Sequence, residues 1–133
     1  MLNQLKKTFN SNEPNKVLQS REFSLICIRE RKEWQAFLSR SKSQVSMVFK
    51  HSALCDISDA ALQEFEAFAA GNNSLAYGIV DVIEDRWLSH EIASEMGIRH
   101  ESPQIIMIQD SRVVWHASHS SITADQLRQA IDS

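Results

Sequence analysis

The stretch Val45-Ser46-Met47-Val48-Phe49-Lys50-His51-Ser52-Ala53-Leu54-Cys55-Asp56-Ile57-Ser58 contains the change of pattern that decides the fold. Residues 45–49 form a short apolar run, which is typical of a buried strand. The polar break that begins at Lys50 leads directly into a helix, and one apolar face of this helix is formed by Ile57, Ala61, Phe65 and Phe68. Gly71 follows in the position of a left-handed helix stop. The stretch therefore predicts a strand and a helix with Cys55 at their junction.

The same alternation continues on both sides of this stretch. Further strands are predicted over residues 23–28, 75–82, 105–108 and 113–115, and further helices over residues 30–41 and 86–96. A last helix is predicted to follow Thr123, because Thr123 and Gln126 have the spacing of a capping box. Ile122 can also pack on Leu127 as a hydrophobic staple.

The order of these elements, together with the positions of Cys55 and Pro103, predicts the fold class. We expect a thioredoxin-like α/β domain, a three-layer sandwich with a central mixed sheet and helices on both faces. The chain of 133 residues with 43% hydrophobic residues has the size and core of one domain. Residues 1–21 are polar and are expected to form a loose or partly helical extension, and residues 22–133 the domain.

Composition excludes several classes of protein. The net charge of -3 lacks the clustered basic face that a nucleic-acid or membrane-surface protein needs. No run of 18 apolar residues is present, and polar residues follow Lys6 and Lys7 where a signal peptide would be apolar. We therefore expect a cytoplasmic protein. In that compartment we do not expect the two cysteines to form a structural disulfide.

Cys55 is the candidate reactive thiol. Backbone amides at a helix N-terminus carry partial positive charge, so they stabilise a thiolate more than a thiol. The thiolate is the nucleophile of disulfide exchange. Ser58 stands where a dithiol site has its second cysteine, which favours monothiol exchange: Cys55 holds a small thiol until a second thiol releases it. The alternative is that Cys55 serves only as a small apolar residue and that Ser58 is an ordinary serine in the first turn of the helix.

The residues near Cys55 carry charges of both signs. Asp56 suits the helix dipole, but its charge beside the sulfur opposes thiolate formation. Lys50 and His51 could offset the charge of Asp56, or they could belong to a solvated strand end. Cys27 lies in a predicted core strand and is expected to be a buried, inert thiol.

Ser102-Pro103 stands immediately before the predicted strand of residues 105–108. Proline is allowed at the first position of a strand. In thioredoxin-like folds a cis proline occupies this place beside the reactive cysteine, and the residue before it offers its backbone to an extended substrate. The match to this fold predicts a cis Ser102–Pro103 bond, with Ser102 and Pro103 as substrate contacts.

Several short motifs carry a family resemblance. They are Phe49-Lys50-His51-Ser52, Cys55, Ile57-Ser58, Val82-Ile83-Glu84-Asp85-Arg86, His100-Glu101-Ser102-Pro103-Gln104 and Trp115-His116-Ala117-Ser118-His119. From about Phe23 to the C-terminus, the chain resembles the YtxJ-type proteins, the monothiol bacilliredoxins of the bacillithiol system. The resemblance implies a thioredoxin fold with Cys55 as the attacking thiol and Pro103 as the cis proline. We also expect Ser58 to be a further substrate contact and no bound cofactor to be needed. It also implies bacillithiol, or a similar low-molecular-weight thiol, as co-substrate and oxidised, thiolated proteins as partners.

The chain departs from the family at one position of this site. The family pattern is Thr-Cys-Pro-Ile-Ser, whereas this chain has Leu54-Cys55-Asp56-Ile57-Ser58. Proline is favourable at the first helical position, and its replacement by Asp56 changes the charge beside the sulfur. A redox-inactive binding module on a thioredoxin scaffold is therefore the alternative function.

The histidines offer a third possibility. His116 and His119 have His-x-x-His spacing, and His51 with Cys55 gives His-x-x-x-Cys, so four ligands could in principle form a zinc site. Nothing in the sequence forces the two pairs together, and we favour the absence of a metal. His116 and His119 are then surface residues near a sheet edge, and Trp115 packs in the core or at that edge.

Overall fold

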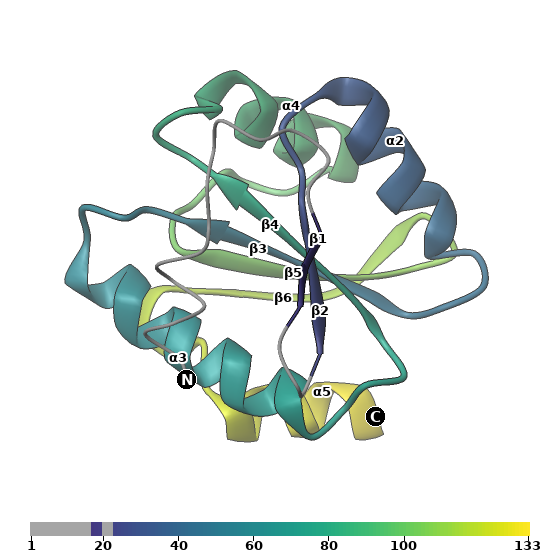
Figure 1. Cartoon of the computed structure of the whole chain (residues 1–133), viewed down its shortest axis with the longest axis vertical. Helices are drawn as coiled ribbons and strands as arrows, with labels where there is room; N and C mark the ends of the chain where they lie inside the picture. The colour runs from purple at the N-terminus through teal and green to yellow at the C-terminus, as the bar shows by residue number, and fades with distance from the viewer. Residues whose placement is uncertain (1–16, 20–22) are drawn as a thin grey trace.

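In the part of the chain that the structure describes, six strands form one mixed sheet in the order β1-β2-β4-β3-β5-β6 (Figure 1). The computed structural model describes residues 17–19 and 23–133. The strands are β1 (Val17–Gln19), β2 (Ser24–Cys27), β3 (Ser46–His51), β4 (Ala76–Asp81), β5 (Gln104–Gln109) and β6 (Arg112–Ser118). β4 runs parallel to both β2 and β3, whereas the other neighbouring strands are antiparallel. The loops that follow β3 and β4 therefore leave the sheet at the same edge.

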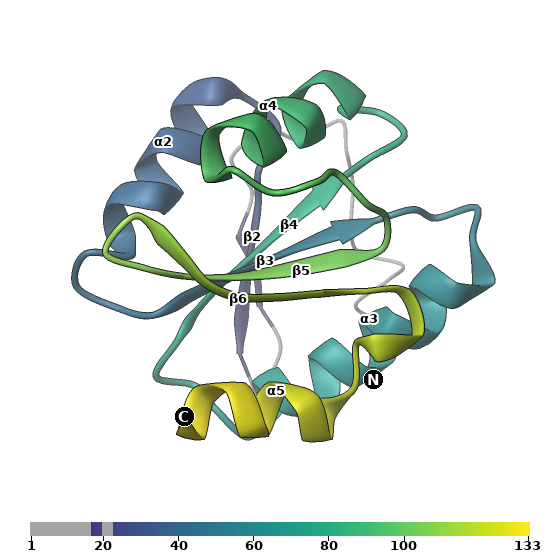
Figure 2. The same cartoon turned by 180° about the vertical axis from the view of Figure 1, so that it is seen from behind.

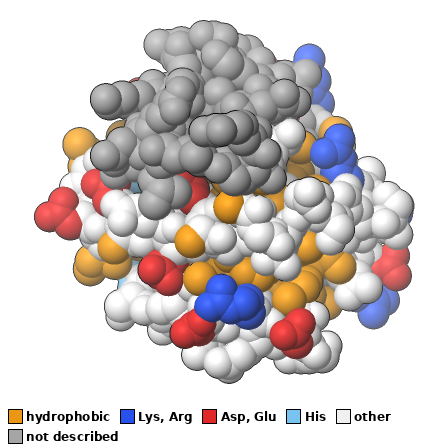
Figure 3. Space-filling model, turned by 60° about the horizontal axis from the view of Figure 1, so that its bottom comes forward, with side chains coloured by type: hydrophobic (Ala, Val, Ile, Leu, Met, Phe, Trp, Pro, Cys, Tyr) orange, Lys and Arg blue, Asp and Glu red, His pale blue; other side chains and the backbone are white. Residues whose placement is uncertain are grey.

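Helices cover both faces of the sheet (Figure 1, Figure 2). α3 (Asp56–Ala70) and α5 (Ala124–Asp132) lie on one face, and α2 (Arg31–Arg40) and α4 (Arg86–Met96) lie on the other. This arrangement confirms the predicted three-layer α/β architecture. Seen from the side of α3 and α5, the described surface mixes acidic, basic and apolar side chains (Figure 3). None of the helices that the structure describes has the length and apolar character needed to cross a membrane.

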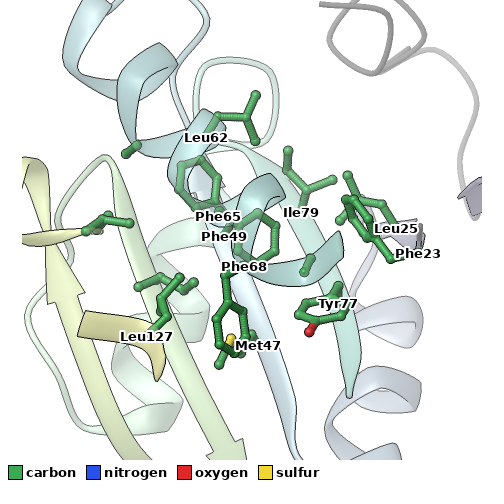
Figure 4. Packing of buried hydrophobic residues seen from close by; sticks show 14 of the residues in the cluster. Phe23, Leu25, Met47, Phe49, Leu62, Phe65, Phe68, Tyr77, Ile79 and Leu127 are labelled. Atoms are coloured by element: carbon green, nitrogen blue, oxygen red, sulfur yellow. The ribbon is translucent and has the colours of Figure 1, made fainter. Parts of the chain in front are cut away.

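The larger core lies between the sheet and helices α3 and α5 (Figure 4). The rings of Phe49 and Phe65 stack with their centroids 5.2 Å apart, and Tyr77 meets Phe65 edge-on at 5.6 Å. Each such side chain, when fully buried, contributes about 1.5–3 kcal/mol. Ile122 and Leu127 are both buried in this cluster, as the predicted staple requires. The core thus fixes α3, and with it the position of the residue before this helix, on β3.

The second core lies between the sheet and helices α2 and α4. Trp34 is fully buried there, and its Nε1–H donates to Glu95 at 2.9 Å, which joins α2 to α4. β4 passes close beneath α2 at Gly78. A Cβ at this position would lie 2.7 Å from Ile28 Cδ1 and 3.0 Å from Phe37 Cε1, so a larger residue here would require these side chains to move.

The structure differs from the sequence prediction at three places around α3. β3 continues through Lys50 and His51, because both pair with β4 and neither belongs to the polar break. Ile57 is 50% exposed, and Ser58 takes the inward position instead, so Ile57 is not part of the core face. Gly71 has φ -97°, so α3 ends without a left-handed residue.

Two other local predictions, the bounds of α4 and the start of the last helix after Thr123, are confirmed. α4 has the predicted bounds, and Gly97, with φ 72°, follows it in the left-handed conformation. Asp110 and Ser111 have φ values of 57° and 62° and form the tight turn between β5 and β6. Thr123 caps α5 by accepting the N–H of Gln126 at 3.1 Å.

The predicted polar extension, residues 1–21, contributes to the sheet. Val17–Gln19 form β1, antiparallel to β2, so these three residues are neither loose nor helical. Residues 1–16 and 20–21 lie outside the described part of the chain. The sheet therefore reaches beyond the boundary at residue 22 that the sequence predicts.

Candidate active site

Cys55 is the residue that precedes the first turn of α3. Its backbone is extended, with φ -123° and ψ 122°, and its side chain is partly exposed. Its N–H donates to the Ser52 carbonyl at 3.2 Å, and its own carbonyl accepts the N–H of Asp59 at 3.1 Å, which is the first hydrogen bond of the helix. The amides of the first turn have no helical acceptor, so their partial positive charge is available to an anion at Cys55.

The residues next to Cys55 are exposed. Leu54 is 87% exposed, and Asp56 and Ile57 also face solvent. Asp56 occupies the first helical position, where its carboxylate interacts favourably with the helix dipole. The surface around the thiol therefore combines one carboxylate with two apolar side chains.

Ser58 was expected to contact substrate, but its side chain is fully buried. Its Oγ accepts the N–H of Ser52 at 2.9 Å and is hydrogen-bonded to Nδ1 of His51 at 2.8 Å. His51 is itself buried at the end of β3. From its buried position, Ser58 therefore hydrogen-bonds to the loop between β3 and α3. It does not line the exposed surface near Cys55.

Lys50 does not lie at a solvated strand end. Its side chain is fully buried on the opposite face of the sheet from α3, where Nζ donates to the Ser89 carbonyl of α4 at 2.9 Å. Nζ also lies 3.2 Å from Nδ1 of His100. Burial lowers the pKa of Lys50 from 10.5 to about 8. Burial, and then the charge of Lys50, lower the pKa of His100 from 6.5 to about 4.

The Ser102–Pro103 peptide bond is cis, as predicted. Lys50 pairs with Gln104 in the antiparallel β3–β5 ladder, so Pro103 stands at the register position opposite His51. The carbonyl of Pro103 accepts the N–H of His119 at 3.0 Å. The backbone of Ser102, by contrast, forms no hydrogen bond within the described residues. Ser102, whose backbone groups are unpaired within the described residues, therefore lies one register position beyond His51, the last residue of β3.

Cys27 is buried in β2, as expected. In the sheet, β4 separates β2 from β3, the strand that leads to Cys55. Neither cysteine forms a disulfide. Cys55 is therefore the accessible thiol of the two.

The four-ligand metal site is not formed. The described residues contain no group of three or more His, Cys, Asp or Glu side chains that could hold a metal ion. His116 and His119 are exposed on and after the edge strand β6, whereas His51 is buried against Ser58. Trp115 packs against the larger core from β6, in agreement with its predicted role.

Sequence reasoning did not identify His100 or Ser89 as partners of the site. His100 lies in one of the motifs quoted above, but no local pattern indicates that its ring meets Lys50. The available signal was the alternation of β3: Lys50 shares a face with Val48, so it points toward α4 rather than toward α3.

Comparison with known proteins agrees with this geometry. The sequence profile of the family described as monothiol bacilliredoxin BrxC matches residues 26–127, which is most of the chain. The chain belongs to the monothiol bacilliredoxin family. The resemblance carried by the motifs around Cys55 and Pro103 is therefore confirmed. Family and fold together support a thiol oxidoreductase.

Solved structures support the same fold. One, described as a candidate oxidoreductase with a thioredoxin fold, has 27% sequence identity and a TM-score of 0.74, and the match covers 80% of this chain and 93% of that chain. The thioredoxin of Trypanosoma brucei brucei has 15% identity and a TM-score of 0.68, with 86% and 94% covered. Thioredoxin NaTrxh of Nicotiana alata has 18% identity and a TM-score of 0.67, with 86% and 95% covered. The two thioredoxins show the fold alone.

Proposed function

We propose that this bacilliredoxin is a monothiol thiol–disulfide oxidoreductase with Cys55 as its nucleophile. The observation that carries the proposal is the accessible thiol of Cys55 at the N-terminus of the 15-residue helix α3. Ser58 occupies the position where a second cysteine would allow an internal disulfide. Cys27, the other thiol, is buried two strands from β3. A single accessible thiol suits exchange through a mixed disulfide with a small thiol.

The proposed substrate is a cytoplasmic protein whose cysteine carries bacillithiol, or a similar small thiol, in a mixed disulfide. The Cys55 thiolate attacks the sulfur of the small thiol, and a new disulfide forms between the two. The target cysteine leaves as a thiolate and takes a proton from water. A second molecule of small thiol then attacks the adduct, which restores Cys55 and gives a disulfide of the small thiol. No bound cofactor takes part in either step.

The substrate backbone is proposed to pair with Ser102. Its N–H and C=O form no hydrogen bond within the described residues. An extended segment that pairs here would add a short strand at the end of β5, which is a common mode of peptide recognition. Substrate alignment would thus depend on Ser102 and Pro103, and bond exchange on Cys55.

Asp56 favours a second candidate function, a redox-inactive binding module. Its negative charge follows the sulfur directly and opposes thiolate formation, whereas the helix amides favour the thiolate. The accessible cysteine and the family membership support the redox reading. Both functions predict the same fold, so exchange itself must be measured.

The test compares the full chain with two cysteine variants. Each protein is mixed with a bacillithiolated model peptide, and intact mass records both loss of bacillithiol from the peptide and its gain by the protein. We expect the wild type and Cys27→Ser to remove bacillithiol through one adduct on Cys55, and Cys55→Ser to be inactive. Retained exchange in Cys55→Ser would refute the assignment of the nucleophile. The absence of any adduct on the wild type would favour the binding module.

A further inference from the structure

Lys50 is a buried amine that joins two parts of the fold around the site. Its side chain leaves β3 toward α4, where Nζ donates to the Ser89 carbonyl at 2.9 Å. Nζ also lies 3.2 Å from Nδ1 of His100. Because an ammonium group has only donors, Nδ1 of His100 is the acceptor of this second bond.

Among the described residues, none provides a counterion for Lys50. Within the described residues, no carboxylate oxygen lies within the 4.0 Å of Nζ that defines an ion pair. Besides Lys50, the charged or titratable groups that act on His100 are His90, whose ring centroid lies 4.1 Å from that of His100, Arg86 and Glu101. Asp85, bonded to Arg29, is a further buried carboxylate on this side, at the N-cap of α4. Burying a lysine without a carboxylate costs stability, so Lys50 is poorly explained as a packing residue.

His100 belongs to the loop of residues 97–103, which connects α4 to β5 and carries the cis Ser102–Pro103 bond. Figure 2 shows this loop running from α4 to the edge of the sheet where β3 ends. Three further contacts hold it from β5 and from the end of β6: Gln104 Nε2 to the Arg99 carbonyl, Ser118 Oγ to Glu101, and the His119 N–H to the Pro103 carbonyl. Lys50 adds a contact from β3, the strand that leads into Cys55.

We propose that Lys50 is a positioning residue whose contact with His100 sets the place of the Pro103 loop relative to Cys55. The inference rests on the proposed function, because only a substrate that contacts both segments depends on their relative position. Its backbone must pair with Ser102 while its sulfur meets Cys55, so a displaced loop binds a substrate that spans both segments less tightly. Loss of the contact should impair substrate alignment and leave the intrinsic reactivity of Cys55 unchanged.

The experiment removes each end of this contact in the full chain. Lys50→Met keeps most of the aliphatic volume without a donor, and His100→Phe keeps a ring without an acceptor. His90→Gln is the matched control, because His90 is exposed and its ring lies at a tilt against that of His100. With a bacillithiolated peptide as substrate, we expect KM to rise roughly tenfold in both variants while kcat changes less than about twofold, which corresponds to about 1.4 kcal/mol of substrate binding.

Two further readouts separate positioning from loss of structure. Alkylation of Cys55 by iodoacetamide needs only the thiolate, and it should proceed at the wild-type rate in both variants. The double variant should be no worse than either single one, because both remove the same contact. An unchanged KM in Lys50→Met, or losses that add in the double variant, would overturn the inference.

A failure of the proposed function gives a different result. In that case the wild type itself does not exchange bacillithiol, and the contact is tested by amide hydrogen exchange over residues 97–103. Faster exchange in Lys50→Met and His100→Phe than in His90→Gln supports the positioning role. Equal rates in all three variants overturn it.

Discussion

Replacing Lys50 by methionine should change how the stability of the fold depends on pH. Burial lowers the pKa of Lys50 from 10.5 to about 8, because the interior disfavours the ammonium form. Between these two values the unfolded chain binds more protons than the folded chain, so the free energy of unfolding rises with pH. The slope approaches about 1.4 kcal/mol per pH unit, and the whole window contributes about 3 kcal/mol. This contribution to stability is complete above about pH 10.5, the pKa of the lysine in the unfolded chain. It is lost as the pH falls through about 8, the pKa of Lys50 in the folded chain.

Urea unfolding of both proteins from pH 7 to pH 10.5, followed by tryptophan fluorescence, measures this difference. Burial also raises the pKa of Tyr77, so the fold loses stability above about pH 10 as unfolded chains ionise their tyrosine. That effect is present in both proteins and cancels when the curves are subtracted. The wild-type curve should rise relative to that of Lys50→Met. Parallel curves would show that the Lys50 ammonium is not desolvated in the folded chain.

Three other substitutions test the local structure. Asp56→Asn removes the charge beside the sulfur and should accelerate alkylation of Cys55 by iodoacetamide at pH 7 and low salt, with a smaller gain at high salt; an unchanged rate would mean that this carboxylate does not act on the thiolate. Gly78→Ala places a Cβ 2.7 Å from Ile28 Cδ1 and should cost about 1–3 kcal/mol in urea unfolding, whereas a neutral result would show that the core yields at this point. Thr123→Ala removes the cap of α5 and should cost about 1 kcal/mol by the same assay, with Thr123→Ser as the variant that retains the cap.

Elements could be predicted from the sequence where burial follows the local pattern. α4 has its predicted bounds because Leu88 and Ile92 recur at helical spacing and Gly97 supplies the left-handed residue after it. Gly71 ends α3 in the same way in the sequence, yet its N–H bonds to the Phe68 carbonyl at 3.1 Å with a negative φ. Glycine accepts either sign of φ, so the residue type alone could not distinguish the two helix ends.

The candidate site could be predicted only in part, for a related reason. Cys55 was found because it stands at a junction that local patterns define, and the cis bond before Pro103 was predicted from the match to the thioredoxin-like fold. Lys50 and His51 were assigned to a polar break because of their side chains, although their backbones pair with β4. The partners that bury Lys50 lie 39 and 50 residues further along the chain, in Ser89 and His100. A local window contains neither partner, so the burial of this lysine becomes visible only in the fold.

Ser58 links the monothiol character of the site to its geometry. The absence of a sulfur at this position leaves Cys55 without an internal disulfide partner. The hydroxyl present instead accepts the Ser52 N–H and bonds to His51, so it ties the loop before Cys55 to both β3 and α3. A thiol is a weaker hydrogen-bonding group than a hydroxyl, so a cysteine here would supply a second sulfur only by weakening this tie. The residue that closes the dithiol route is therefore also the residue that holds the single thiol at the helix N-terminus.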